Sequence, residues 1–186
     1  MDTETLTILA VCVAVIAVIA AGWAYSVRER RKRLRARFGP EYERTVDAVG
    51  DPAKAEAVLR KRANRVDRFK LHPLTAAQAE EFGREWRRIQ GTFVDNPGAA
   101  AAEADALVAQ VMVARGYPPG DFDKRAEDVS VDHPHVVENY RIARALMVRR
   151  ERGEAGTEEL RKAIVNYRAL FDDLLQVESS ERRRAS

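Results

Sequence analysis

An uninterrupted apolar run near the amino terminus constrains this chain more than any other feature. Residues 6–25 read LTILAVCVAVIAVIAAGWAY and contain no charged side chain. A helix rises about 1.5 Å per residue, so this run would form a helix roughly 30 Å long, which matches the hydrocarbon thickness of a bilayer. The sequence therefore predicts a transmembrane helix over residues 6–25, preceded by a short extracytoplasmic segment, residues 1–5.

The charges that flank this run predict its orientation. Two acids and no base stand in residues 1–5. A basic juxtamembrane helix is expected over residues 26–38, with these basic side chains: Arg28, Arg30, Arg31, Lys32, Arg33, Arg35 and Arg37. Because basic residues stay in the cytoplasm, we expect a single-pass protein of the inner (plasma) membrane, with its amino terminus outside. The same seven side chains are candidate contacts for anionic lipid headgroups.

Two other interpretations of the apolar run are disfavoured. A cleaved signal peptide needs basic residues before the run, and here the charges are reversed. A lipoprotein anchor at Cys12 needs a small residue before the cysteine, and Val11 stands there. Cys12 is the only cysteine of the chain, so the rest of the chain has no thiol nucleophile.

The residues after the anchor carry helix signals at regular intervals. Gly39-Pro40 should break the first helix, which makes that point a candidate swivel. Further start or stop signals follow at Gly50, Asp51-Pro52, Thr75 with Gln78, Asn96-Pro97 and Gly116. No stretch alternates polar and apolar residues for long enough to predict a strand. The predicted fold class is therefore all-α.

The expected architecture is a cytoplasmic helical domain over residues 39–178, a bundle of about five helices, followed by a disordered tail over residues 179–186. Short helices around 41–49 and 122–128 are also compatible with the pattern. The largest side chains should meet in the core of the bundle: Phe82, Trp86, Phe93, Tyr140, Tyr167 and Phe171.

The distribution of charge argues against a nucleic-acid-binding protein. The chain has a net charge of +3 and an isoelectric point near 9.2. Residues 1–37 together carry +4, so the expected domain and tail carry a net charge of −1. A domain that binds nucleic acid is expected to carry a basic excess of its own. We therefore expect no nucleic-acid partner.

One small cluster of residues could serve metal or acid–base chemistry. Asp132, His133 and His135 lie within four positions of one another. A helix opened by Pro134 and capped by Asp132 or His133 explains the same pattern without a metal. Zinc sites usually space their histidines three to five residues apart, so we expect no metal here.

A second candidate site lies along the most periodic helical segment. Trp86, Gln90, Phe93 and Asp95 could line a partner surface, because they combine aromatic and polar groups. At helical spacing Trp86 is more often a core residue, and we favour the core interpretation.

No phosphate-binding loop, dinucleotide fingerprint, zinc-protease motif or serine-hydrolase motif occurs in the chain. We therefore expect no enzyme and no cofactor. The sequence favours a membrane-anchored adaptor or scaffold, with the lipid bilayer and an unidentified protein as partners. The alternative is a metal-dependent hydrolase using Asp132, His133 and His135. The oligomeric state stays open.

Five short motifs are distributed along the chain: Phe38-Gly39-Pro40-Glu41-Tyr42, Trp86 to Gln90, Phe93-Val94-Asp95 with Pro97, Arg115-Gly116-Tyr117-Pro118 and Ser130-Val131-Asp132-His133-Pro134. Together they resemble a family of uncharacterised bacterial proteins with one amino-terminal hydrophobic segment. The resemblance covers nearly the whole chain and implies a helical domain behind the hydrophobic segment. Members are often labelled hypothetical or putative secreted proteins, so the resemblance implies no catalytic residues. The flanking charges conflict with secretion, and we follow the charges.

Overall fold

The computed structural model describes residues 3–175, and the side chains from residue 14 onward. The expected tail, residues 179–186, lies outside the described residues. Every regular element in the described range is a helix, which confirms the all-α fold class. The helices are α1 (Thr3–Phe38), α2 (Pro40–Val49), α3 (Pro52–Val66), α4 (Ala76–Asp95), α5 (Pro97–Ala114), α6 (Phe122–Asp132), α7 (Val137–Glu151) and α8 (Thr157–Leu175).

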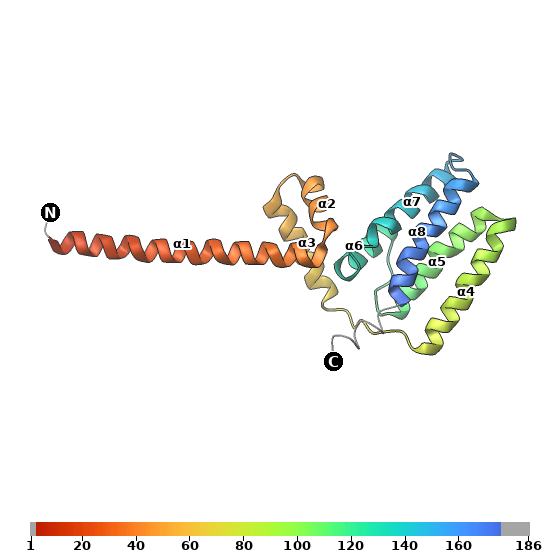
Figure 1. The fold of residues 1–186 in the computed structure, drawn as a ribbon, viewed down its shortest axis with the longest axis horizontal. Helices are drawn as coiled ribbons and strands as arrows, with labels where there is room; N and C mark the ends of the chain where they lie inside the picture. Colours follow the sequence, from red (N-terminus) through yellow and green to blue (C-terminus); the bar gives the residue numbers. More distant parts are fainter. Residues whose placement is uncertain (1–2, 176–186) are drawn as a thin grey trace.

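Helix α1 is continuous over 36 residues and projects far beyond the other helices (Figure 1). All side chains in residues 14–25 are exposed. In the part of the chain that the structure describes, no helix is long and apolar enough to cross a membrane.

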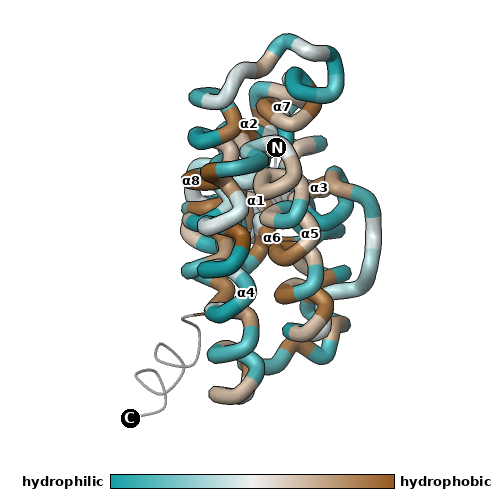
Figure 2. The backbone as a smooth tube through the Cα atoms, turned by 90° about the vertical axis from the view of Figure 1, so that its right-hand side faces the viewer, coloured by the Kyte–Doolittle hydropathy of each residue, from teal (hydrophilic) through white to brown (hydrophobic). Residues whose placement is uncertain are grey.

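Four helices, α4, α5, α7 and α8, lie side by side as a bundle (Figure 1). Hydrophilic and hydrophobic residues both occur along the helices (Figure 2), and each of the four buries apolar side chains in the core of the bundle. The inner side of the first half of α5 is made of small residues, and Ala100, Ala101 and Ala104 are fully buried. Small side chains allow close approach of the neighbouring helices, and the aromatic residues of α4, α7 and α8 fill the remaining space.

A second, smaller core lies where α1 meets the rest of the chain. Leu34 and Phe38 of α1 pack with Tyr42 of α2 and with Leu59 of α3. Helix α6 joins the two cores, because Val131 lies in the smaller one and Val129 in the bundle. We call α2 to α8 together with the last turns of α1 the body. Its core takes in Leu34 and Phe38, so the packed unit begins before residue 39, where the sequence placed the domain boundary.

Several predicted helix ends are confirmed. Gly39 has φ 47° and α2 begins at Pro40, so the first helix does break there. Gly50 ends α2 in the left-handed conformation, with φ 74°. Thr75 and Gln78 form a reciprocal capping box, which satisfies backbone N–H groups that the first turn of α4 would leave unpaired.

Two details differ from the expectation. Within residues 3–175, seven helices follow α1, because the short α2 and α6 are fully formed, where about five were expected. Helix α6 also extends through Asp132, and the backbone N–H of His133 closes it by donating to the carbonyl of Val129. Helix α7 begins only at Val137, without a side-chain cap. The prediction that Asp132 or His133 caps a helix opened by Pro134 is therefore wrong.

Candidate functional site

The junction between α1 and the helices that follow it combines a small apolar core with several ion pairs. Gly39 allows the turn, since its positive φ and extended ψ are unfavourable for residues with a Cβ. Phe38 before the turn and Tyr42 after it are both buried in the smaller core. Gly39-Pro40 is therefore a packed corner, and the packing on both sides opposes the swivel that the sequence suggested.

Ion pairs tie α1 to α3 beside this corner. The guanidinium of Arg31 donates to Glu56 at 2.7 Å, and the hydroxyl of Tyr42 donates to the same carboxylate at 2.9 Å. Nearly two turns further along α1, Arg37 donates to Asp67 at 2.7 Å. The hydrogen bond from Arg37 holds the pKa of Asp67 below its usual value. These contacts fix the end of α1 on the surface of α3.

A buried carboxylate joins the smaller core to the bundle. Glu41, in the first turn of α2, is only 2% exposed. It accepts a hydrogen bond from Arg62 of α3 at 2.9 Å and two from Arg141 of α7 at 2.7 and 2.8 Å. Both of its oxygens accept hydrogen bonds from guanidinium groups, so this site is built to hold three helices together.

The same network continues into α6. Arg65 of α3 donates to Asp128 and, at 3.0 Å, to Glu127. Arg62 also donates to the hydroxyl of Ser130 at 3.1 Å, and that hydroxyl donates to the carbonyl of Glu127. Charged groups from α2, α3, α6 and α7 are thus mutually neutralised at the boundary between the two cores.

The predicted cluster of Asp132, His133 and His135 does not form one site. His133 is buried, and its Nδ1 lies 2.5 Å from an oxygen of Asp173 on α8. The ring of His135 lies beside Gly39, and Asp132 accepts a hydrogen bond from the hydroxyl of Tyr117 at 3.3 Å. The three side chains contact different neighbours. Within the described residues, no group of three or more His, Cys, Asp or Glu side chains is arranged to hold a metal ion.

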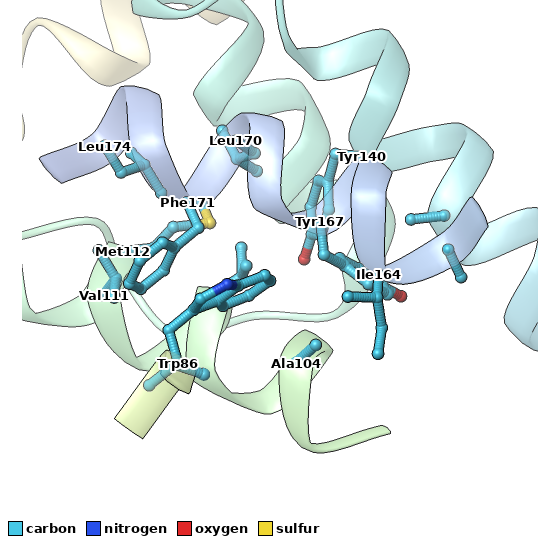
Figure 3. Packing of buried hydrophobic residues seen from close by; sticks show 14 of the residues in the cluster. Trp86, Ala104, Val111, Met112, Tyr140, Ile164, Tyr167, Leu170, Phe171 and Leu174 are labelled. Atoms are coloured by element: carbon cyan, nitrogen blue, oxygen red, sulfur yellow. The ribbon is translucent and has the colours of Figure 1, made fainter. Parts of the chain in front are cut away.

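The second predicted set separates into a core residue and a surface. Trp86 is 3% exposed and stacks on Phe171 with ring centroids 4.7 Å apart, as Figure 3 shows, so it belongs to the core of the bundle. Asp95 is exposed at the end of α4. Gln90 and Phe93 line a groove of about 280 Å³ with residues of α8: Arg161, Ile164 and Val165.

A polar cluster inside the bundle has no counterpart in the sequence analysis. The hydroxyl of Tyr140 accepts a hydrogen bond from Nε of Arg125 at 2.9 Å, and Arg125 lies 3.7 Å from Asp105. Burial, together with the charge of Asp105, raises the pKa of Tyr140 to about 12. Burial likewise raises the pKa of Tyr167, which packs edge-on against Tyr140. Two neutral phenols beside one ion pair are consistent with a structural role.

Sequence reasoning missed the partners of Glu41 and Arg125. Arg141 stands 100 residues from Glu41, and a single sequence contains no periodic or spacing signal for such a pair. The one available sign is indirect: Glu41 occupies a helix start next to proline, where an acid also favours the helix dipole.

Comparison with known proteins found no match to the chain among protein-family models, curated proteins or solved structures.

Proposed function

We propose that this protein is a single-pass membrane protein whose helical body acts as an adaptor on the cytoplasmic face. Residues 6–25 form the anchor, and residues 6–13 precede those whose side chains the structure describes. The observation that carries the proposal is the contrast along α1. Its apolar half stands alone, whereas its basic half is built into the body.

Over residues 14–25, the part of its apolar half whose side chains the structure describes, α1 has no protein neighbour to cover it. Val18 is 72% exposed and Trp23 is 70% exposed. A row of large apolar side chains in water is unfavourable, so such a helix calls for lipid or another apolar surface around it. A helix satisfies all of its interior backbone hydrogen bonds within itself, which is the condition for entering a bilayer.

The basic half favours a cytoplasmic body. Seven Lys and Arg side chains stand within twelve residues after Tyr25, against two acids and no base before Leu6. An adaptor role follows from confinement, because an anchored body meets other membrane proteins at a high effective concentration, so weak contacts suffice. The groove between α4 and α8 offers such a contact surface, with Val165 62% exposed.

Fusions to the carboxyl terminus test the topology. A fluorescent protein fused there should fluoresce, and alkaline phosphatase should be inactive, because the former folds in the cytoplasm and the latter outside it. Both fusions should sediment with membranes after a wash in high salt. Active phosphatase, or release of the fusion by salt, would contradict the proposal.

Site-specific crosslinking in cells tests the adaptor role. A photoreactive residue at Val165, in the groove, should give a discrete adduct with another protein. The matched control is Val113 on α5, which is 50% exposed but lies outside that groove. Equal adducts at both positions, or none at Val165, would count against a dedicated contact surface.

A further inference from the structure

We infer that the seven basic side chains of α1 divide into two sets with different partners, a division that rests on the proposed membrane anchor. The body-facing set consists of Arg31, Arg35 and Arg37. The lipid-facing set, which binds the anionic headgroups of the bilayer, consists of Arg28, Arg30, Lys32 and Arg33.

Acids of the body engage every member of the body-facing set. Arg31 contacts Glu56 at 2.7 Å, and the Glu56 side chain is only 8% exposed. Arg37 contacts Asp67 at 2.7 Å and lies 3.6 Å from Asp132. Arg35 lies 3.2 Å from Glu43, and its guanidinium sits over the ring of Tyr42. Arg31 and Arg37 are thus held by close ion pairs, and Arg35 is held by a more exposed pair together with the ring of Tyr42.

The lipid-facing set lacks such partners within the described residues. All four side chains are exposed. The ion pair that involves one of them joins Arg33 to Glu29 within α1 itself, at 3.2 Å, and leaves Arg33 78% exposed. Four cations against one nearby acid therefore face outward from the helix.

Height above the membrane separates Arg35 and Arg37 from the lipid-facing set, whereas Arg31, roughly 9 Å beyond Tyr25, is set apart by its ion pair with Glu56. With a rise of about 1.5 Å per residue, Arg28 lies roughly 4.5 Å beyond Tyr25 and Arg33 roughly 12 Å beyond it. The attraction to anionic lipid decays over about 8 Å at physiological ionic strength, and flexible side chains extend the reach of a backbone position by several ångströms. Arg37, roughly 18 Å beyond Tyr25, is too distant to contribute much, and it is the member most firmly paired to the body.

The lipid composition around the reconstituted full chain tests this division. The chain is placed in vesicles of phosphatidylcholine with a minority of phosphatidylglycerol. A polymer that cuts out small bilayer discs then extracts the protein, and mass spectrometry gives the ratio of the two lipids in the discs. We expect phosphatidylglycerol to be enriched over the bulk. Each basic residue at an anionic surface strengthens attraction about fivefold, so neutralising all four should return the ratio to the bulk value.

Three variants separate the two sets. Substitution of the lipid-facing set by Gln should abolish enrichment and leave the thermal unfolding of the body unchanged. Substitution of four basic residues on α4 and α8 removes the same charge far from α1 and should keep enrichment: Arg84, Arg87, Lys162 and Arg168. Arg31→Gln with Arg37→Gln should keep enrichment but lower the unfolding temperature.

The division is overturned if the lipid-facing variant keeps its enrichment, or if the control on α4 and α8 loses it equally. Enrichment that resists high salt would also overturn it, because screening must weaken a charge-based contact. A chain that incorporates into vesicles without enriching phosphatidylglycerol contradicts this inference alone. Failure of the chain to incorporate at all contradicts the membrane anchor and the inference together.

Discussion

Trp86 shows how much of the bundle depends on single aromatic side chains. Its ring stacks on Phe171 from the opposite side of the bundle and lies among residues of α5 and α8, including Met112 and Ile164 (Figure 3). Its indole Nε1 is buried without a hydrogen-bond partner in the described structure. The residue therefore stabilises the fold through packing and dispersion, against a desolvation penalty of about 1 to 3 kcal/mol for the unpaired donor.

Trp86→Ala should lower the free energy of unfolding by about 3 to 5 kcal/mol, because it leaves a large cavity under Phe171. Val94→Ala is the matched control on the same helix, since Val94 is 84% exposed, and it should change stability by less than about 0.5 kcal/mol. Thermal or urea unfolding of the full chain in detergent, followed by circular dichroism, measures both. Equal stability of the two variants would show that Trp86 is not a core residue.

Because the pKa of Tyr140 is raised, we expect the free energy of unfolding to fall at alkaline pH. Burial raises its pKa to about 12, whereas an unfolded tyrosine titrates near 10. The contribution to stability is fully present below pH 10 and falls as the pH rises toward 12, because only the unfolded chain releases the proton in that window. Tyr140→Phe should flatten this decline, although Tyr117 and Tyr167, whose pKa values are also raised, keep part of it.

Unfolding measured at pH 8 and at pH 11 tests this prediction. Tyr140→Phe should cost about 0.5 to 1.5 kcal/mol at pH 8, through the lost hydrogen bond from Arg125. The gap to the wild type should narrow at pH 11. Parallel declines of the two proteins would mean that Tyr140 does not titrate differently in the folded chain.

At the scale of helices, the boundary between the two cores depends on Glu41. Its carboxylate is shared by α2, α3 and α7, so it orients three elements at once. A buried ion pair adds little net stability compared with an apolar contact, but removal of one partner leaves the other charges buried and uncompensated.

Glu41→Gln should therefore lower the free energy of unfolding by about 3 to 5 kcal/mol, since Arg62 and Arg141 lose their shared counter-charge. Glu43→Gln is the matched control on α2, because the side chain of Glu43 is 61% exposed and its ion pair with Arg35 is screened by solvent. The control should stay close to wild type in the same unfolding assay. If Glu41→Gln left the free energy of unfolding unchanged, the ion pairs of Glu41 with Arg62 and Arg141 would not be needed for stability.

Helix ends were predictable where local chemistry decides them. Gly50, the Thr75–Gln78 box and the Asn96-Pro97 start act within one turn, so the sequence alone contains the signal. Helix α3 ends at Val66, although the helical spacing of apolar residues continues to Phe69. Phe69 instead packs edge-on against Tyr117, a contact across nearly fifty residues. Tertiary packing of this kind overrides local periodicity.

The candidate sites follow the same rule. The core position of Trp86 could be predicted, because its spacing from Phe82 and Phe93 places all three on one helix face. The positions of the His133 and His135 side chains could not be predicted. They depend on where α6 ends, and at that end His133 pairs with Asp173 of α8, forty residues away in the chain.

At the scale of the whole molecule, α1 links the proposed anchor to the body. Leu34 and Phe38 are buried in the body, Arg31 is paired with Glu56 of α3, and Arg37 is paired with Asp67 at the end of that helix. No break interrupts the helix between Thr3 and Phe38. The proposed anchor and the body should therefore move as one rigid unit, and insertion of the anchor would hold the body at a fixed height and angle to the bilayer.

The distribution of distances between a spin label on α1 and one on α8 tests whether the connection is rigid. Cys12, the single native cysteine, provides one spin-label position in the anchor, and Val165→Cys provides a second on the exposed face of α8. Pulsed electron–electron double resonance on the full chain in lipid nanodiscs measures the distance between the two spin labels. A rigid junction predicts one narrow distance distribution, which should broaden when Leu34→Ala and Phe38→Ala loosen the junction. A broad distribution in the otherwise unchanged chain, no wider after those two substitutions, would contradict a rigid connection between anchor and body.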